Sequence, residues 1–302
     1  MLTLPEVRVG DPLCHEGLAV FPLFDGAGGG ADYLLSDEAL AAGAVTVEEL
    51  TEGGSVPTLV VNNPTESLVL FLEGEELRGA KQNRVLNTSV LAGARAKTPI
   101  PVSCVEQGRW RYNSASFGHG GTHSSPKLRT VLKESVTRAA KEGRGHDSDQ
   151  GGVWKEVSRQ MTALGASSVT AAMADTYQAH GDRLAEFRAR LPYVEGASGL
   201  AVAVGGKGLS LDLFDKPATC RKVWARLLTG AVMDALEAGP GQQPAGKEQV
   251  EQALAALRGS AWQQVPPVGV GEEYRSDAEA GRHATALVLG RSVVHGSLVV
   301  AG

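Results

Sequence analysis

The sequence predicts an α+β fold, with a mixed, mainly antiparallel sheet, a helical block over about residues 126–191 and two further C-terminal helices. Three observations lead to this prediction. Short apolar or alternating runs bounded by Gly, Asn and Pro fill the first part, helical periodicity begins after Ser125, and alternating strands return after Pro192. Strands, then helices, then strands are typical of α+β proteins and not of a regular βαβ alternation.

The first part of the chain is expected to be rich in strands, with one short helix at 36–43 between an N-cap serine and a glycine. The glycine-, serine- and histidine-rich stretch 113–125 is expected to connect this part to the helices. The expected strands are 18–24, 45–50, 55–63, 67–77, 84–93 and 98–107.

The helical block is expected to start at Ser125-Pro126, where an N-cap serine precedes a proline in the first turn. Apolar residues then recur at helical spacing in three segments, at 126–142, around 153–161 and from about 168 to 190. The whole chain, 1–302, is interpreted as one domain. Residues 126–191 are either an insertion on one face of the sheet or a small subdomain.

The last part of the chain is expected to contain two hairpins and two helices. "GLAVAVGG" and "GLSLDLF" form the first hairpin, and Gly290-Arg291 is the two-residue turn of the second. Asp215 is the expected N-cap of a helix that starts near Pro217, and a further helix covers 247–258.

Composition limits the classes of function. The chain has 302 residues, 42% of them hydrophobic and 21% charged, which is typical of a soluble globular protein. Its net charge of −5 gives no bulk attraction for nucleic acid or for an anionic membrane. No apolar run is long enough to span a bilayer, and the N-terminus does not have the pattern of a secretion signal.

The cysteines indicate a reducing compartment. Cys14, Cys104 and Cys220 are odd in number and widely separated, which predicts reduced thiols in a cytoplasmic protein. The sequence contains no Cys-x-x-Cys pair, which argues against a structural zinc site. Cys104 and Arg109 are one residue short of the Cys-x5-Arg spacing of cysteine phosphatases, so Cys104 is interpreted as a core residue.

The stretch "LEGEELRGAKQNRVLN", Leu72 to Asn87, carries the strongest functional signal, because a strongly apolar strand leads directly into it. If the strand continues to residue 77, Glu73 and Glu75 lie on one face, roughly 6.5–7 Å apart. Two carboxylates at that spacing suit a shared divalent cation or an acid/base pair, and both are candidate catalytic residues. The metal and the cofactor, if any, stay open.

The second half of this stretch is a candidate ligand-binding segment. Lys81, Gln82, Asn83 and Arg84 follow Gly79, and two cations with two amides are suited to holding phosphate or carboxylate oxygens. We expect these four residues to line one solvent-reachable cleft with Glu73 and Glu75. The residues expected to extend the site are Asn87, Glu106 and Arg109, with Trp110 or Tyr112 as a stacking wall.

Two purely structural interpretations stay open for the same stretch. It can be an exposed hairpin whose charges pair across strands, or a buried polar network that fixes strand register.

Three histidines are weaker candidates for functional residues. His119 and His123 would suit zinc only on a helix, which the glycines between them disfavour, and His295 is interpreted as a core histidine.

Four segments of the chain resemble a known family. "LEGEELRGAKQNRVLNTSVL", "CVEQGRW", "DQGGVW" and "GLSLDLFD" with the Trp and Leu residues that follow resemble the bacterial ADP-ribosylglycohydrolase and rhodanese-phosphatase-superfamily-associated protein family. The resemblance spans nearly the whole chain, and "GEEL-GAKQNR" is its most specific part. It implies a context near NAD or ADP-ribose metabolism and supplies no reaction or catalytic residue.

Two functions follow as expectations. The first is an enzyme or specific binder for a small phosphorylated nucleotide-type ligand in NAD- or ADP-ribose-linked metabolism. The alternative is a non-catalytic scaffold or regulatory module whose polar strand contacts a protein partner. The two differ in shape, since a ligand site needs the polar groups to converge in a pocket and a scaffold needs them on an open face.

Overall fold

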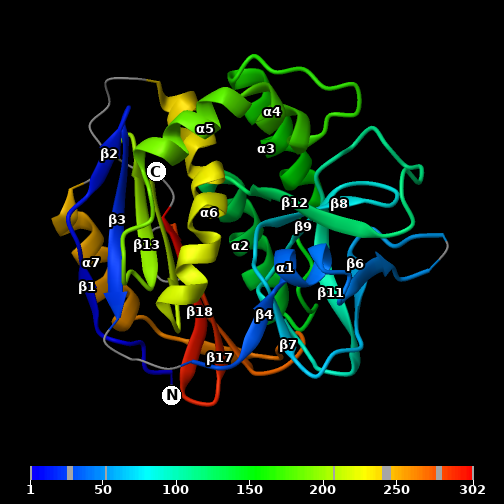
Figure 1. The fold of residues 1–302 in the computed structure, drawn as a ribbon, viewed down its shortest axis with the longest axis horizontal. Helices are drawn as coiled ribbons and strands as arrows, with labels where there is room; N and C mark the ends of the chain where they lie inside the picture. The colour runs from blue at the N-terminus through cyan, green and yellow to red at the C-terminus, as the bar shows by residue number, and fades with distance from the viewer. Residues whose placement is uncertain are drawn as a thin grey trace.

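The computed structural model describes residues 2–25, 30–51, 53–206, 208–239, 246–276 and 281–300. An open antiparallel sheet and a closed barrel lie on either side of a layer of helices, as Figure 1 shows. The sheets are mostly antiparallel and seven helices occur among the described residues, so the fold is α+β, as the sequence predicts.

The open sheet, here called the large sheet, has the strand order β1-β3-β13-β14-β18-β17-β16-β15, and β2 pairs with β3 beside β1. Strand β3 from the start of the chain pairs with β13, and β14 pairs with β18 near its end, so both ends of the chain contribute strands to this sheet. Its strands are β1 (Val7–Val9), β2 (Leu13–His15), β3 (Leu18–Asp25), β13 (Gly199–Val204), β14 (Gly208–Phe214), β15 (Gln263–Val265), β16 (Glu272–Ser276), β17 (Arg282–Leu289) and β18 (Ser292–Val300).

Both faces of the large sheet are buried, because side chains alternate between two separate apolar cores. On β3, Leu18 and Val20 belong to the core shared with the helices on the barrel side, whereas Ala19 and Phe21 belong to the core on the opposite face. Helix α7 (Lys247–Arg258) packs on that opposite face through Val250, Leu254 and Leu257. It lies on the outside of the sheet in Figure 1.

The barrel closes through the strand order β11-β6-β5-β12-β8-β9, and a three-stranded sheet, β10-β7-β4, lies with it. Pairings such as Arg84 with Cys104 and Phe117 with both Gly79 and Val47 bring the ends of β5, β8 and β11 and the starts of β6, β9 and β12 to one rim. This end is called the barrel rim below. The strands are β4 (Tyr33–Leu35), β5 (Thr46–Glu49), β6 (Thr58–Asn63), β7 (Leu68–Phe71), β8 (Glu75–Gly79), β9 (Arg84–Leu86), β10 (Val90–Ala92), β11 (Ala96–Cys104) and β12 (Phe117–His123).

Helix α6 joins the two β structures, because it contacts β13 of the large sheet and β12 of the barrel. It is the longest of the described helices, and fourteen of its twenty-two residues are buried. Gly230 permits the close approach to the barrel, since a Cβ atom there would lie 2.2 Å from the carbonyl oxygen of Ser124. The helices besides α7 are α1 (Ser36–Ala41), α2 (Pro126–Lys141), α3 (Gln150–Ala163), α4 (Met173–Ala179), α5 (Gly181–Arg190) and α6 (Pro217–Ala238).

Helices α2 to α5 contact one another in sequence order, and α2 also contacts α6 and β17. Their apolar residues, among them Leu132, Val157 and Phe187, share one core with residues of the large sheet. Among the described residues, no helix combines the length and the apolar character that crossing a bilayer requires.

The expected single strand at 67–77 is wrong. Strand β7 ends at Phe71 and β8 begins at Glu75, because Gly74 adopts a φ of +79° and the Glu75 N–H closes a turn on the Leu72 carbonyl at 3.1 Å. The region expected as one strand at 84–93 likewise divides into β9 and β10.

Two further expectations need correction. The stretch 113–125 is not only a connection, since its second half forms β12. The expected helix 168–190 begins only at Met173 and breaks at His180, where α4 gives way to α5. Its expected first turn is lost because the Ser168 hydroxyl bonds nearby backbone N–H groups of Thr170 and Ala172, and local bonds of this kind compete with the helix.

The expected N-cap at Asp215 is also wrong, because Lys216 occupies the N-cap position of α6 and makes no side-chain capping bond. Asp215 instead accepts hydrogen bonds from the Tyr33 hydroxyl (2.5 Å) and the Ala31 N–H (3.0 Å). The expected hairpins β13–β14 and β17–β18 are both present, with Gly290 in the second turn at a φ of +61°. Cys104 and Cys220 are buried and all three thiols are free, as expected.

Candidate functional site

Glu73 and Glu75 do not face each other across a shared site. The turn at Gly74 directs Glu73 toward α2, where the Lys133 ammonium lies 2.5 Å and the Arg129 Nε 3.5 Å from its carboxylate oxygens. Glu75 bonds a different set of groups, the Ser36 hydroxyl, the Leu72 N–H and the His119 imidazole. The expectation of two carboxylates on one strand face is therefore corrected.

Both carboxylates are fully buried and ionised. Burial would raise the pKa of Glu73, but Lys133 and Arg129 outweigh it and lower that pKa to about 2. For Glu75, burial is likewise outweighed by Arg226 and His119, and its pKa is also about 2. Glu73 is held as a carboxylate by Lys133 and Arg129, and the guanidinium nearest to Glu75 is that of Arg226, 3.8 Å away.

The Glu73 network continues into the large sheet. Arg129 makes a two-bond contact with Asp212, at 2.8 and 2.7 Å, and the His295 ring lies between Asp212 (3.0 Å) and the Ser89 hydroxyl (2.7 Å). The same three residue types, serine, histidine and aspartate joined by hydrogen bonds, form the catalytic triad of serine hydrolases. Here the Ser89 hydroxyl also accepts the Glu73 N–H at 2.9 Å, and His295 uses both ring nitrogens within a buried network.

Asn87 lies beyond the other end of β9, away from the barrel rim. Its side chain donates to the His146 carbonyl oxygen at 2.9 Å and accepts from the Ser103 hydroxyl at 2.6 Å. Glu73, Glu75 and Asn87 thus belong to buried networks that join the barrel to its neighbours.

The remaining predicted residues gather at the barrel rim. We call the residues Lys81, Gln82, Asn83, Arg84, Glu106 and Arg109 the rim cluster. The loop after β8 supplies Lys81, Gln82 and Asn83. Arg84 is the first residue of β9, and the chain that follows β11 supplies Glu106 and Arg109. All six are buried, with at most 8% of each residue exposed.

Hydrogen bonds fix the two rim loops to each other. The Arg109 guanidinium forms a two-bond contact with Glu106, at 2.8 and 2.6 Å, and donates to the Ala80 carbonyl oxygen at 2.7 Å. Glu106 also accepts the Asn83 N–H at 3.0 Å. Burial would raise the pKa of Glu106, but its bonds to Arg109 and Asn83 lower it, so the carboxylate is ionised.

Gln82 occupies the middle of the cluster. Its amide nitrogen donates to the Glu106 carbonyl oxygen at 2.9 Å, and its amide oxygen accepts from Cys104 Sγ (3.1 Å) and from Arg84 Nη1 (3.2 Å). Burial raises the pKa of the Cys104 thiol, which is the opposite of what an activated thiolate requires.

A polar pocket of about 440 Å³ adjoins the rim cluster. Asn83, Glu106 and Arg109 line it from the barrel, while Asp175 and Gln178 line it from α4. Arg78, whose Nε donates to Glu76 at 2.8 Å, adds a further guanidinium to the wall. Three of the predicted site residues, Asn83, Glu106 and Arg109, thus contribute to this pocket.

Lys81 lies beside two half-exposed aromatic rings. Its ammonium is 5.3 Å from the ring centre of Trp110 and 5.0 Å from that of Tyr112, whose exposed fractions are 49% and 50%. The Arg84 guanidinium lies 5.8 Å from the same Trp110 ring. The ammonium also donates to the Gly53 carbonyl oxygen at 2.5 Å, which ties the chain after β5 to the rim.

Glu49, the last residue of β5, is a rim residue that the sequence reasoning missed. Its side chain is 3% exposed and its nearest carboxylate oxygen lies 3.9 Å from Arg84 Nη2. The only local signal is a pair of carboxylates, Glu48 and Glu49, where an alternating strand ends. The sequence does not show that this strand end lies beside Arg84.

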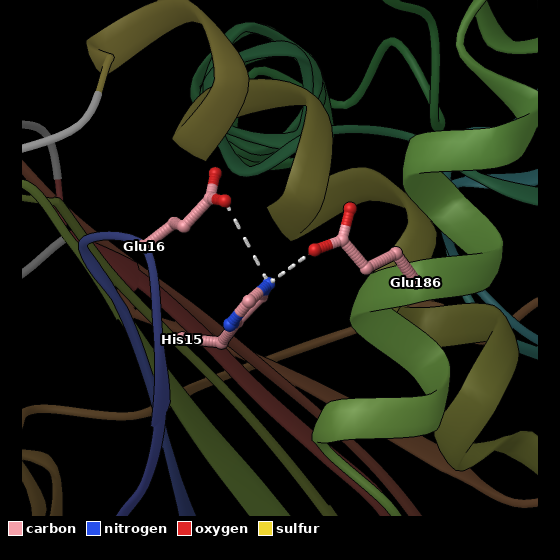
Figure 2. A group of neighbouring side chains, drawn as sticks. All are labelled: His15, Glu16 and Glu186. Carbon is pink, nitrogen blue, oxygen red and sulfur yellow. Dashed lines mark hydrogen bonds and ion pairs between the residues drawn. The ribbon is translucent and has the colours of Figure 1, made fainter.

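One group of side chains outside the rim has metal-binding donor types. His15, Glu16 and Glu186 each place one donor atom within 4.8 Å of the others, and Figure 2 shows the imidazole between the two carboxylates. Arg183 pairs with the other oxygen of each carboxylate, and His15 Nε2 lies 3.2 Å from Glu186. These contacts form a closed ion-pair network that joins the β2–β3 turn to α5.

His119 and His123 do not belong to such a donor group within the described parts of the chain. The His119 Nδ1 accepts the Gly121 N–H at 2.9 Å, so its Nε2 carries the proton that faces Glu75. His123 is buried, and burial together with Arg129 lowers its pKa to about 3.

Comparison with known proteins identifies the family. The family model described as the ARG and Rhodanese-Phosphatase-superfamily-associated Protein domain matches residues 6–299. The chain belongs to this family. The ARG and Rhodanese-Phosphatase-superfamily-associated Protein domain thus includes the large sheet, the helical layer and the barrel rim, and its name records an association with two superfamilies. No curated protein and no solved structure gives a significant match.

Proposed function

We propose that this protein binds a phosphorylated nucleotide-type ligand of the ADP-ribose class at the barrel rim. The observation that carries the proposal is the position of the Lys81 ammonium, 5.3 and 5.0 Å from the half-exposed rings of Trp110 and Tyr112. A cation beside exposed aromatic rings offers the two contacts that a nucleotide needs, one for its phosphates and one for its base.

The chemistry of each contact supports this assignment. Stacking of a base on an aromatic side chain contributes about 1–3 kcal/mol and does not depend on base identity. A lysine ammonium adds charge-assisted hydrogen bonds to phosphate oxygens. The chain as a whole is acidic, with a net charge of −5, so attraction of an anionic ligand has to be local.

Four other members of the rim cluster have positioning roles in this proposal. Glu106, Arg109, Gln82 and Asn83 bond the loop after β8 to the chain after β11. Binding-site loops held by such bonds keep their geometry before the ligand arrives, which lowers the entropic cost of ordering them on binding. The polar pocket beside Asn83 and Arg109 gives the ligand further room along the rim.

The family supports the ligand class by association. Its name links it to the ARG superfamily, and the resemblance noted above associates that superfamily with ADP-ribosylglycohydrolases, which supports a ligand related to ADP-ribose. The proposal covers specific binding. Turnover is a separate question, which incubation of the protein with ADP-ribose and NAD, followed by chromatography of the products, would answer.

Isothermal titration calorimetry with ADP-ribose and NAD tests the proposal. We expect Lys81→Ala to weaken ADP-ribose binding at least about tenfold, and Trp110→Ala to weaken it by about 5- to 150-fold, the equivalent of 1–3 kcal/mol. The matched control is Lys97→Ala, which removes an exposed lysine from β11 of the same barrel. Absence of binding to the wild-type protein, or equal losses in the Lys81 and Lys97 variants, would contradict the proposal.

A protein-docking function is the second candidate. Leu50, Trp110 and Tyr112 have exposed fractions of 48–50%, and Leu50 follows β5 at the barrel rim. Aromatic residues of this kind often anchor protein interfaces. This scaffold alternative is favoured if neither nucleotide binds and if Trp110→Ala abolishes retention of one reproducible partner protein that the Lys97→Ala control still retains.

A further inference from the structure

We propose that Glu49 and Arg84 together recognise the vicinal diol of the ligand's sugar, an inference that rests on the nucleotide-binding function proposed above. The two side chains come from different barrel strands, the end of β5 and the start of β9. Their exposed fractions are 3% and 0%, so both are buried at the rim. The closest approach between them, from Arg84 Nη2 to Glu49 Oε1, is 3.9 Å.

The pair is not joined by a direct hydrogen bond. A charge-assisted N–H···O bond between such groups is about 2.7–2.9 Å long, roughly 1 Å shorter than the observed separation. Among the described residues, neither carboxylate oxygen of Glu49 has a hydrogen-bond partner, and neither does Arg84 Nε or Nη2. The third guanidinium nitrogen, Nη1, is occupied by Gln82 and by the Asn83 carbonyl oxygen.

Buried polar atoms without partners cost free energy, and they are rare in folded proteins. Here four of them occur on two neighbouring side chains, and they are complementary in number. An ionised carboxylate only accepts hydrogen bonds and a guanidinium only donates them. A single ligand group that satisfies all four atoms therefore has to donate twice and accept twice.

A vicinal diol meets this requirement. Its two hydroxyl groups donate one proton each to the two Glu49 oxygens, and their oxygens accept the Arg84 Nε and Nη2 protons. A phosphate does not, because it supplies acceptors only and would bring negative charge next to Glu49. A carboxamide has two N–H groups, but they diverge from one nitrogen, whereas a carboxylate takes two parallel donors.

The position of the pair agrees with the rest of the proposed site. The Arg84 guanidinium and the Lys81 ammonium lie 5.8 and 5.3 Å from the same Trp110 ring, which is half exposed. A nucleotide carries base, sugar and phosphate in that order along one short molecule. The inference assigns phosphate to Lys81, base to the aromatic rings and sugar to Glu49 with Arg84, and it thereby revises the initial expectation that Arg84 holds phosphate.

Comparison of ADP with 2′,3′-dideoxy-ADP by isothermal titration calorimetry tests the inference on the unmodified protein. The two ligands share base and phosphates and differ only in the diol. We expect the wild-type protein to bind ADP at least about tenfold more tightly, because a site built to bond hydroxyl groups rejects an analogue that lacks them. Equal affinity for both ligands would overturn the inference and leave the proposed function standing.

Two variants assign the effect to residues. Glu49→Gln keeps the size of the side chain and removes the second acceptor, so we expect its preference for ADP over the dideoxy analogue to fall to about threefold or less. Lys81→Ala is expected to weaken both ligands by the same factor and to keep the preference. A Glu49→Gln protein with the full wild-type preference contradicts the inference, and so does a wild-type protein that binds ADP-ribose but not ADP. Failure of the wild-type protein to bind ADP, ADP-ribose and NAD overturns both this inference and the proposed function.

Discussion

Gly230 of α6 shows how one missing side chain positions a whole helix. A Cβ atom at this position would lie 2.2 Å from the Ser124 carbonyl oxygen, and a backbone atom of the barrel cannot move aside. Alanine would gain about 0.8–1.0 kcal/mol of helix propensity, but overpacking costs about 1–3 kcal/mol, and here the obstacle is rigid. The overpacking term therefore dominates.

We expect Gly230→Ala to lower the free energy of unfolding by about 1–3 kcal/mol, as measured by urea denaturation. Gly118→Ala on β12 is the matched control, because a Cβ atom at Gly118 meets no atom within 4 Å. That variant should differ from the wild-type protein by less than about 0.5 kcal/mol. Equal effects of the two substitutions would contradict the role assigned to the α6–barrel contact.

Glu73 gives stability a defined dependence on pH. Its pKa is about 2 in the folded protein and 4.5 without the fold. Because the pKa is lower in the folded protein, the unfolded chain binds more protons between these two pH values. The stabilisation that ionised Glu73 gives to the folded state is therefore fully present above pH 4.5 and is lost as the pH falls toward 2.

Glu73→Gln should therefore flatten the loss of stability between pH 4.5 and 2, as followed by urea denaturation at a series of pH values. At pH 7 it should lower the free energy of unfolding by about 3–5 kcal/mol, because Lys133 and Arg129 lose a buried counter-charge. The control Glu66→Gln alters a pair that is 72% exposed and should leave the pH profile unchanged. An unaltered profile in the Glu73 variant would refute this account.

The candidate site could be predicted from sequence only where its residues are close along the chain. Lys81 to Arg84, with Glu106 and Arg109, do meet at the barrel rim, since two neighbouring barrel strands lead to them. The expectation that Glu73 and Glu75 share one strand face is wrong, because the alternation of side chains along a strand does not reveal a turn at Gly74. Their partners Lys133 and Arg226 lie sixty or more residues away, and no local pattern identifies them.

At the scale of elements, the β2–β3 turn and α5 are joined by the His15, Glu16, Glu186 and Arg183 network drawn in part in Figure 2. The Arg183 and Glu186 side chains are 36% and 39% exposed. Exposed ion pairs contribute about 0–1 kcal/mol, and salt at 1 M screens charges beyond about 3 Å. This network therefore contributes less to the free energy of unfolding than the buried pair of Glu73 and Lys133.

We expect Glu186→Gln to lower the free energy of unfolding by less than about 1 kcal/mol at low salt, with a still smaller effect in 1 M NaCl. Differential scanning calorimetry at two salt concentrations measures this difference. Glu195→Gln, which removes a more exposed pair with Arg221, is the control and should have an effect near zero. A loss of several kcal/mol in the Glu186 variant would mean that the network does more than pair surface charges.

Elements whose signals are local could be predicted, and those formed by distant pairing could not. The β17–β18 hairpin follows from alternation around Gly290-Arg291, which carry the reversal of the chain. Strand β12 was missed because its sequence, "FGHGGTH", has low strand propensity and depends on pairing with β8 and β5. Its bulge between His119 and His123 further hides the period of two.

At the scale of the whole molecule, β18 is the central strand that the C-terminal end of the chain supplies. It pairs with β14 on one side and β17 on the other, and His295 and Ser297 join it to the buried network around Arg129. A chain that ends after Leu289 lacks this strand. We expect it to lose cooperative unfolding and near-ultraviolet circular dichroism.

The control for this truncation removes residues 2–5, which precede the edge strand β1. That shorter deletion should keep cooperative unfolding, because the central strands retain both neighbours. Cooperative unfolding in the protein that ends at Leu289 would show that the large sheet folds without its last strand. The pairing of β3 with β13, some 180 residues apart, explains why the sequence predicts the sheet class and not its strand order.

The edges of the two β structures bear on how this chain avoids aggregation. A closed barrel has no open edge, so its backbone groups offer no template for a strand from another molecule. One edge of the large sheet consists of the three-residue strands β1 and β2, which pair with successive parts of the same edge of β3, and Pro5 lies just before β1. The other ends in three-residue β15, directly followed by Pro266 and Pro267. Short edge strands beside prolines leave few N–H groups in line, and this architecture should therefore resist amyloid-like strand addition in the native state.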